Sequence, residues 1–469
     1  MTRNPTFAIL KDADLTEFRK ILDNSGDVVD SSDDLEKYNR DWTGRYCGSA
    51  TIALRPRTTE QVSRLLKYCN RRRLAVCPQG GNTGLVGGAV PVFDEIVLSM
   101  ERLNRLINHD EVSGVLSAEA GCILETADNF VRERGFVMPL DLGAKGSCML
   151  GGNVATNAGG LRVLRYGGLH GSVLGLRVVL ADGTVLDGMG ACRKDNTGYD
   201  YKQLFIGSEG TLGVITEVNI ATPPLPQSTN VALFSVAIFE DIKRLFGQAR
   251  RDLGEILSAF EFWDVESQKL LDMHFPDNKL PIRPGAFFVL VETSGSDSEH
   301  DQSKLMRFLE DSEAQVVDGT MAQDETQLRR LWALRESIPE ACAREGIVYK
   351  YDVSLPTARM YDPVLALRSR LAHPAISQII GYGHFGDGNI HVNVATQHYE
   401  AAVVAQIEPY IYELVRKHGG SISAEHGVGV LKAPQMGRFA KTAAEMALLR
   451  NIKTLFDPRG ILNPYKVLP

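Results

Sequence analysis

The chain has 469 residues, of which 44% are hydrophobic and 23% charged, and its formal net charge is -7. This length exceeds what one hydrophobic core usually sustains, so we expect a globular protein of two or more domains. The negative charge excludes an electrostatic argument for nucleic-acid binding, which needs clustered lysine and arginine. The one basic run, residues 71–73, is typical of a solvated helix end.

The seven cysteines are scattered, odd in number and contain no C-x-x-C pair. This pattern indicates neither a disulfide scaffold nor a cysteine-rich zinc site, and a reducing compartment fits it best. No run of about 18 apolar residues could cross a bilayer as a transmembrane segment. The acidic opening MTRNPTFAILKDADLTEF resembles neither a signal peptide nor a transit peptide. We therefore expect a cytoplasmic protein or, in a eukaryote, a mitochondrial matrix protein whose presequence has been removed.

The first part of the chain predicts an α+β domain over residues 1–225. Residues 51–57 predict a strand, and residues 58–72 predict a helix whose apolar side chains share one face. From residue 75 to residue 218, short Val/Ile/Leu runs alternate with glycine clusters, which indicates many tight turns. The three prolines in residues 222–228 are incompatible with regular structure, so we place the domain boundary there.

Residues 226–430 predict a second domain with an open antiparallel sheet and helices on one face of it. Its expected strands and amphipathic helices alternate along the chain; the strands lie in residues 285–295, 315–320, 346–356 and 377–385, and the helices in residues 303–312 and 325–337. A third, helical segment, residues 431–469, is expected to return to the first domain.

Two glycine-rich segments stand out in the first domain. In PQGGNTGLVGGAVP, residues 78–91, glycines surround Asn82 and Thr83 directly after an apolar run. Because glycine has no Cβ, successive backbone N–H groups can turn inward and cradle a pyrophosphate. A single cluster is equally consistent with simple turns. The second cluster, residues 143–167, adds more backbone donors and short polar side chains, and together the two predict a long phosphate-bearing ligand.

The segments PQGGNTGLVGG, GGNVATNAGG and FIGSEGTLGVIT resemble the FAD-binding domain of the p-cresol methylhydroxylase (PCMH) and vanillyl-alcohol oxidase (VAO) superfamily, in its branch of D-2-hydroxy acid dehydrogenases. Relatives with covalent flavin carry a histidine after the paired glycines of the first loop. Here Asn82 holds that place, so the resemblance implies non-covalent FAD. It also implies that Asp41, Trp42 and Asn463 approach the cofactor. The residues assigned to FAD are Trp42, Pro78, Gly80, Gly81, Asn82, Thr83, Gly84, Gly143, Ser147, Gly152, Asn153, Thr156, Asn157, Gly159, Gly160, Gly210, Val214 and Asn463.

A literal dinucleotide fingerprint, G-x-G-x-x-G, occurs at Gly381, Gly383 and Gly386. The fingerprint is meaningful only between a strand and a helix, because the helix N-terminus holds the pyrophosphate. The residues that follow, DGNIHVNVAT, alternate like a strand. We therefore predict a hairpin turn and no NAD site.

The same turn begins a polar constellation. His384 lies in the turn, and strand alternation places His391 and Asn393 on one face of the next strand. Further along, Glu425 precedes His426. Two histidines and a carboxylate with open positions are typical of a catalytic divalent metal, which would leave His426 as a base. From the residues alone, satisfied structural histidines are the commoner explanation.

GYGHFGDGNIHVNV and SAEHGVG resemble the metal and base motifs of the D-2-hydroxyglutarate and D-lactate dehydrogenase group. The resemblance implies that His384, His391 and Glu425 bind zinc or a similar ion, and that His426 is the general base. It also implies oxidation of a D-2-hydroxy acid, with D-2-hydroxyglutarate as the first candidate. D-lactate or D-malate oxidation, or transhydrogenation with pyruvate, are the alternatives. Electron-transfer flavoprotein is the implied acceptor.

The segment WALRESIPEACAREGIVYKYD resembles a substrate-recognition segment. Arg335 and Lys350 occupy positions that bind the substrate carboxylates in the relatives. The planar fork of arginine suits this task. Asn393 is assigned to the substrate as well. Without the resemblance, Arg335 is better explained as a solvated helix charge. Close relatives carry a hydroxyl residue four positions after the arginine, where this chain has Pro339, which lacks that hydroxyl and is expected to disturb its helix.

Overall fold

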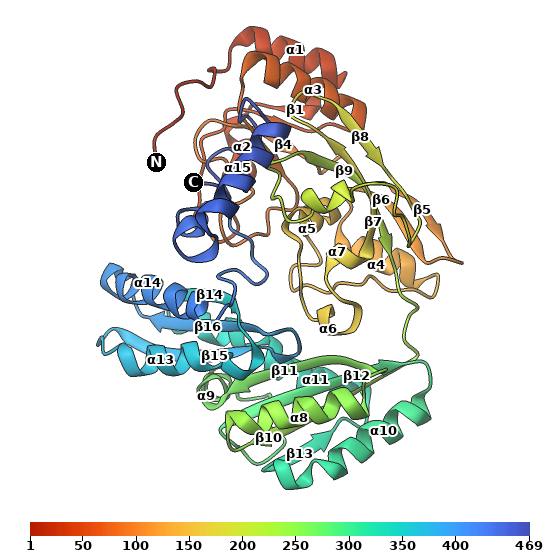
Figure 1. Cartoon of the computed structure of the whole chain (residues 1–469), viewed down its shortest axis with the longest axis vertical. Coiled ribbons are helices and arrows are strands. Elements are labelled where there is room, and N and C mark those ends of the chain that lie inside the picture. The colour runs from red at the N-terminus through yellow and green to blue at the C-terminus, as the bar shows by residue number, and fades with distance from the viewer. The chain divides into compact units, whose positions relative to one another are not determined.

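The computed structural model describes the backbone of residues 1–469 and every side chain except that of Ser25. It forms two compact units, each made of non-contiguous segments (Figure 1). Unit 1 contains residues 1–160, 167–225 and 425–469, and unit 2 contains residues 161–166 and 226–424. The three-part division at residues 225 and 430 stays a prediction.

Unit 1 contains two sheets. The first has the order β1-β2-β4-β3, in which β2, β4 and β3 run parallel and β1 pairs antiparallel with β2. The second is antiparallel, with the order β5-β6-β9-β7-β8. Their strands are β1 (Val28–Val29), β2 (Ala53–Leu54), β3 (Val76–Gln79), β4 (Ile96–Ser99), β5 (Leu106–Asp110), β6 (Val115–Glu119), β7 (Val173–Val179), β8 (Val185–Gly188) and β9 (Val214–Ala221).

The helix predicted over residues 58–72 is confirmed as α3. Thr58 caps it by accepting a hydrogen bond from the Gln61 N–H, and Val62, Leu65 and Leu66 are buried on one face. The helices of unit 1 are α1 (Asp12–Leu22), α2 (Ser32–Asn39), α3 (Thr59–Arg72), α4 (Leu124–Arg132), α5 (Leu150–Thr156), α7 (Leu169–Ser172) and α15 (Ala443–Phe456). At the C-terminal end, the backbones of Val76 and Asn463 are hydrogen-bonded, so the last segment lies beside β3.

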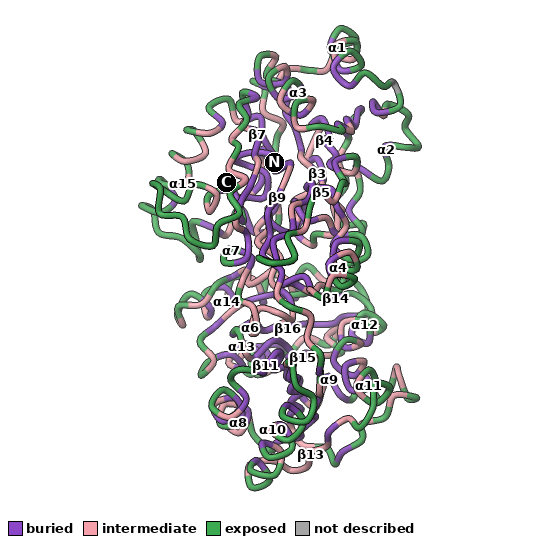
Figure 2. The backbone as a smooth tube through the Cα atoms, turned by 90° about the vertical axis from the view of Figure 1, so that its right-hand side faces the viewer, coloured by how far each residue is buried: buried purple, intermediate pink, exposed green. Residues whose placement is uncertain are grey.

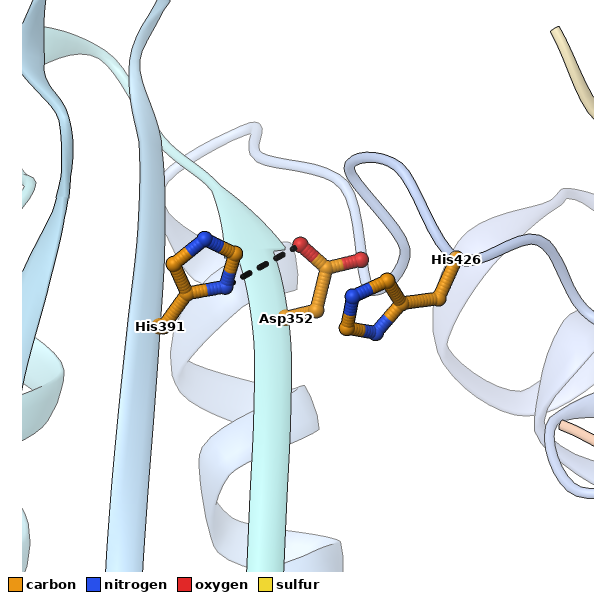
Figure 3. Close-up of side chains that lie close together, drawn as sticks. All are labelled: Asp352, His391 and His426. Atoms are coloured by element: carbon orange, nitrogen blue, oxygen red, sulfur yellow. Dashed lines mark ion pairs between the residues drawn. The ribbon is translucent and has the colours of Figure 1, made fainter. Parts of the chain in front are cut away.

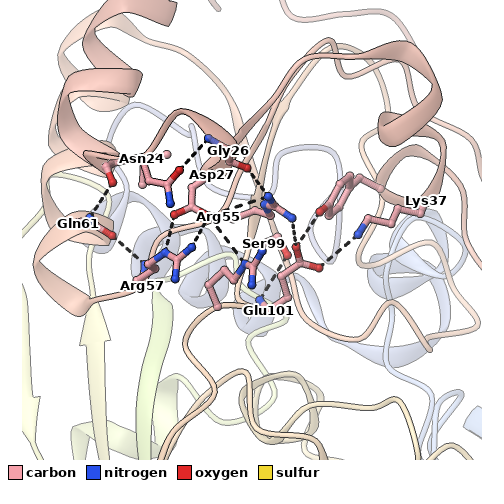
Figure 4. A network of polar contacts seen from close by, with 12 residues as sticks. Asn24, Gly26, Asp27, Lys37, Arg55, Arg57, Gln61, Ser99 and Glu101 are labelled. Atoms are coloured by element: carbon pink, nitrogen blue, oxygen red, sulfur yellow. Dashed lines mark hydrogen bonds and ion pairs between the residues drawn. The ribbon is translucent and has the colours of Figure 1, made fainter.

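An ionic network that includes the buried carboxylate of Asp27 stabilises the first sheet (Figure 4). The Arg57 Nε lies 2.6 Å from the carboxylate of Asp27, which is 1% exposed. Arg55 and Tyr38 donate to the same oxygen of Glu101, at 3.0 and 2.9 Å. Because these residues flank β1, β2 and β4, the network links three of the four strands of the first sheet. The first glycine loop starts at the end of the fourth strand, β3.

Unit 2 is built on one seven-stranded sheet of order β13-β10-β12-β11-β15-β16-β14. All its ladders are antiparallel, so the predicted open antiparallel sheet is confirmed. The strands are β10 (Ser228–Val236), β11 (Leu257–Asp264), β12 (Phe287–Gly295), β13 (Asp318–Met321), β14 (Ile347–Ser354), β15 (Ile376–His384) and β16 (Asn389–Thr396).

Helices cover both faces of this sheet, so the prediction of helices on one face is wrong. In β11, Phe260 contacts Phe246 of α8, whereas the alternate residues Ala259 and Trp263 pack in a core with α9, α11 and α12. The reason is that every residue of β11 is buried, so both sides of this strand are covered (Figure 2). The helices are α6 (Val163–Tyr166), α8 (Phe239–Asp252), α9 (Val265–His274), α10 (Ser298–Asp311), α11 (Glu325–Glu336), α12 (Ile338–Ala343), α13 (Asp362–Arg370) and α14 (Ala401–Lys417).

The glycine fingerprint at residues 381–386 lies in a hairpin, as predicted. β15 ends at His384, one turn of 3-10 helix follows, and β16 starts at Asn389 and pairs antiparallel with β15. Gly388 in the turn has a positive φ of 83°, which favours glycine. A strand therefore follows where a dinucleotide site needs a helix. Across the described residues, no helix has the length and apolar character that spanning a membrane requires.

Candidate active site

A cavity of about 430 Å³ lies in unit 1 between the two glycine loops. Of the residues assigned to FAD, those that line it are Trp42, Pro78, Gly80, Gly81, Asn82, Thr83, Gly84, Gly143, Gly152, Asn153, Thr156, Gly159, Gly210 and Val214. Ser147, Asn157, Gly160 and Asn463 are not among the lining residues. The walls are thus largely backbone and small side chains, the surface expected for a pyrophosphate cradle.

The two loops touch at Gly81. A Cβ placed on this residue would lie 2.1 Å from the carbonyl oxygen of Ser147 and 2.9 Å from the Cα of Cys148. These are backbone atoms, which cannot rotate away as the end of a side chain can. Only glycine allows the first loop to approach the second this closely, and the cavity depends on that approach.

Replacing Gly81 with alanine is expected to weaken FAD binding roughly 5- to 150-fold, because overpacking of about 1–3 kcal/mol would push the loops apart. The flavin-to-protein absorbance ratio after gel filtration measures the loss. Gly190→Ala is the control, since a Cβ there meets nothing within 4 Å. Equal flavin content in both variants would contradict the assigned role of Gly81.

Asn82 is held by the backbone. Its φ is 52°, and its side-chain amide donates a 2.8 Å hydrogen bond to the carbonyl oxygen of Arg40. The indole N–H of Trp42 donates to the carbonyl of Thr83 at 3.1 Å. An engaged amide is no nucleophile, so these contacts are consistent with non-covalent flavin.

Asn463 is not part of the cavity lining but contacts segments that are. Its amide donates to the carbonyl oxygens of Glu209 and Gly88, at 2.7 and 3.1 Å. The ammonium of Lys466 donates to its side-chain oxygen at 2.6 Å. The predicted approach of Asn463 to the cofactor is therefore not direct lining; the residue joins the C-terminal segment to the first glycine loop and to the FIGSEGTLGVIT segment.

Glu209, which the sequence did not single out, lines the cavity and holds the turn after His426. Its carboxylate accepts hydrogen bonds from the backbone N–H groups of Val428 and Gly429, at 2.6 and 2.8 Å. Burial raises the pKa of Glu209 although these donors act in the opposite direction. Its place inside the FIGSEGTLGVIT motif was the available signal.

Glu425 and His426 line the same unit 1 cavity as the glycine loops. The carboxylate of Glu425 accepts a 3.2 Å hydrogen bond from the backbone N–H of Gly160, in the second loop. The predicted base and the predicted cofactor loops therefore belong to one cavity. The other expected metal ligands, His384 and His391, belong to unit 2.

In unit 2, the two histidines present their Nε2 atoms to one another at 3.4 Å. Two nitrogen ligands about 2.0–2.1 Å from a tetrahedral zinc ion lie about 3.3–3.4 Å apart. The spacing of His384 and His391 therefore fits two imidazoles that share one ion. Their identity as ligands stays a prediction.

Each histidine has a buried carboxylate on its other side. His384 Nδ1 lies 2.8 Å from the nearer oxygen of Glu261. His391 Nδ1 is 3.8 Å from Asp352, which lies directly opposite it on β14 (Figure 3). A carboxylate behind a histidine ligand is a common arrangement at metal sites, because it orients the ring.

Arg335 is 6% exposed, so its interpretation as a solvated helix charge is wrong. Its Nε and Nη2 atoms each lie 3.0 Å from Glu261 Oε2, and its guanidinium lies 4.8 Å from the ring centre of Tyr382. Burial raises the pKa of the Glu261 carboxyl, but the contacts with the His384 imidazole and the Arg335 guanidinium more than offset it, so the pKa is lowered. Glu261 lies on a buried strand that carries no motif, which is why the sequence did not reveal it.

The remaining substrate candidates share one face of the sheet. Asn393 pairs opposite Lys350, and Tyr382 pairs opposite His391. The amide of Asn393, which is fully buried, donates to the hydroxyl of Tyr382 at 3.2 Å. Register therefore brings these side chains to the face over which Arg335 lies.

Pro339 does not disturb a helix, contrary to the prediction. α11 ends at Glu336, and Pro339 stands in the first turn of α12. An N–H in the first turn has no intrahelical partner to lose, so proline is tolerated there. The absence of a hydroxyl group at this position remains.

Two protein-family models match the chain: "FAD binding domain" over residues 50–188 and "FAD linked oxidases, C-terminal domain" over residues 225–467. The FAD-binding domain predicted from the glycine loops is thereby confirmed. The p-cresol methylhydroxylase structure superimposes with a TM-score of 0.73 at 15% identity, covering 98% of this chain and 97% of that one. This likeness confirms the predicted fold class, α+β with a PCMH-type FAD domain.

Curated relatives cover the whole chain. The probable mitochondrial D-2-hydroxyglutarate dehydrogenase of Oryza sativa subsp. japonica is 52% identical, over 100% of this chain and 84% of its own. The mitochondrial D-2-hydroxyglutarate dehydrogenase of Bos taurus is 52% identical, over 99% and 85%. A Saccharomyces cerevisiae protein named D-2-hydroxyglutarate–pyruvate transhydrogenase is 43% identical, over 99% and 96%.

Proposed function

This chain belongs to the D-2-hydroxyglutarate dehydrogenase family of FAD-linked oxidases, and from this membership we propose that it oxidises D-2-hydroxyglutarate to 2-oxoglutarate. One observation carries the proposal: His426 lines the cavity that the two glycine loops form within unit 1. The reaction removes the hydroxyl proton of the substrate and a hydride from the carbon that carries this hydroxyl. It therefore requires a base beside the flavin site.

In the proposed reaction, His426 accepts the proton of the substrate hydroxyl at a ring nitrogen. FAD, when bound, supplies the acceptor for the C2 hydride, so proton and hydride leave as the C–O bond becomes a carbonyl. The walls of the cavity hold the substrate carbon in place and exclude water. No proton is lost to solvent in this step.

We assign a divalent ion, zinc first, to His384, His391 and Glu425. Two imidazoles and one carboxylate are a catalytic zinc donor set, and the 3.4 Å Nε2 separation supports it. Such an ion, when bound, supplies polarisation of the substrate hydroxyl. The carboxylates of Glu261 and Asp352 keep the rings of His384 and His391 oriented, respectively.

Arg335, Lys350 and Asn393 are assigned to the substrate carboxylates. The burial of Arg335 supports this role, because a guanidinium held rigidly out of water loses little entropy when it binds an anion.

For the electron acceptor that reoxidises the flavin we propose electron-transfer flavoprotein. For the location we propose the mitochondrial matrix, in keeping with the mitochondrial names of the relatives. Reoxidation rates with electron-transfer flavoprotein and with pyruvate distinguish this acceptor from the transhydrogenase alternative.

The test is anaerobic reduction of the bound flavin by a panel of 2-hydroxy acids. D-2-hydroxyglutarate is expected to bleach the flavin fastest, and the L-enantiomers are expected to leave it oxidised. Faster bleaching by D-lactate or D-malate would favour those alternatives. No bleaching by any D-acid would overturn the proposal.

Pro339 offers a sharper test of the second carboxylate. Pro339→Thr is expected to raise kcat/KM for D-2-hydroxyglutarate by about five-fold, since one added hydrogen bond contributes about 1 kcal/mol. The rate on D-lactate, which lacks that carboxylate, should not change. Pro339→Ala is the control for backbone effects. A gain of the same size on both substrates would show that the hydroxyl does not act on the distal carboxylate.

A further inference from the structure

Glu261 links two groups of side chains that the proposed function keeps separate. It lies on β11, is 2% exposed and stands directly opposite His384 in the strand register. Its two oxygens lie 2.8 and 3.0 Å from His384 Nδ1, and Oε2 also lies 3.0 Å from both Nε and Nη2 of Arg335. One carboxylate therefore contacts a proposed metal ligand and a proposed substrate-binding group.

The contact selects one form of the His384 ring. A carboxylate only accepts hydrogen bonds, so Nδ1 must carry the proton that it donates to Glu261. The lone pair then lies on Nε2, the atom that faces His391 Nε2 at 3.4 Å. Without the carboxylate, the proton could reside on either nitrogen and the ring could rotate about its Cβ–Cγ bond.

The same carboxylate orients Arg335. Two of the three guanidinium nitrogens, Nε and Nη2, point at Glu261, and the plane is supported by the ring of Tyr382. The Nη1 side is left for a substrate carboxylate. Because Arg335 and Glu261 neutralise one another, this side offers a directed donor more than a net charge.

We propose that Glu261 is a positioning residue that couples metal binding to substrate-carboxylate binding, by holding His384 and Arg335 in register with one another. The inference rests on the proposed function, and it adds a residue that touches neither the reacting atoms nor the substrate. It explains why a charged residue stands in the middle of a fully buried strand, between Phe260 and Phe262.

The experiment uses the FAD-loaded full chain with Glu261→Gln. This change keeps the size of the side chain but replaces one accepting oxygen with an NH2 group, which cannot accept a hydrogen bond from His384 or Arg335. Glu292→Gln is the matched control. Glu292 is also 2% exposed, lies on the neighbouring strand β12, and accepts from the guanidinium of Arg162, from Ser258 and from the indole of Trp332. Both variants remove one buried carboxylate from the same sheet.

Zn²⁺ affinity, measured by competition with a chelator, is expected to fall 10- to 100-fold in Glu261→Gln and to stay unchanged in Glu292→Gln. The visible spectrum of bound Co²⁺ should shift only in Glu261→Gln, because only there is the orientation of a ligand changed. KM for D-2-hydroxyglutarate should rise in the same variant. Glu261→Asp, which keeps the charge on a shorter side chain, should lose less affinity and covers the case in which the Gln variant does not fold.

The inference is overturned if Glu261→Gln and Glu261→Asp bind Zn²⁺ like the wild type, or if Glu292→Gln loses as much affinity as they do. These results leave the proposed function standing, since the wild type would still bind the ion and oxidise its substrate. A wild-type protein that binds neither Zn²⁺ nor Co²⁺ overturns the proposed metal site and this inference together.

Discussion

Replacing His426 with alanine is expected to lower kcat by about 10²- to 10⁴-fold, the range over which a positioned general base accelerates a reaction. The imidazole is the group assigned to take the hydroxyl proton, and alanine offers no acceptor in its place. FAD should stay bound, because most of the cavity wall consists of the glycine loops and not of this side chain. Stopped-flow reduction of the flavin measures the chemical step directly.

The control for His426→Ala is His398→Ala, which removes an exposed imidazole and should reduce its flavin at the wild-type rate. A flavin content equal to that of the wild type shows that the cavity is intact. Flavin reduction at more than about a tenth of the wild-type rate in His426→Ala would be too fast for loss of a general base. That result would remove His426 from the proposed role.

Removing the metal is expected to lower turnover at least about 100-fold, because a cation that polarises a reacting oxygen contributes several kcal/mol. Dialysis against a chelator should produce this loss, and added Zn²⁺ should restore the rate. His384→Ala should show the same loss without restoration, since one of two imidazole ligands is gone. Metal content measured by atomic spectroscopy on each sample relates the rate to the ion.

His300→Ala serves as the control for His384→Ala. His300 also lies beside a carboxylate in unit 2, that of Asp301 at 3.0 Å, but its side chain is 53% exposed and outside the proposed site. Its loss should change neither metal content nor rate. Full activity in a wild-type sample shown to contain no metal would exclude the ion from the mechanism.

The parts of the site that local patterns predict are those in which the backbone does the work. Glycine loops need residues without a Cβ, and Gly81 meets the second loop at a distance that only glycine allows. The hairpin at residues 381–388 was predictable because alternation before and after a glycine turn indicates two strands. Both signals are contained in consecutive residues.

The parts that local patterns miss depend on residues far apart in the chain. Glu261 and Arg335 are 74 positions apart, and Glu209 and Val428 are 219 positions apart. A carboxylate on a buried strand carries no sign of its partner until the register of that strand is known. Likewise, the wrong expectation of helices on one face of the sheet came from strands whose apolar runs do not reveal whether one side or both are covered.

By itself, the sequence determined the FAD-binding domain, the hairpin that carries His384 and His391, and the family to which the chain belongs, because each depends on short motifs and local geometry. Only the tertiary structure decided that His426 shares a cavity with the glycine loops, and that one buried carboxylate holds both His384 and Arg335. The physical reason is that these groups meet through strand register and through the packing of the C-terminal segment against the first part of the chain. No local segment encodes either of these.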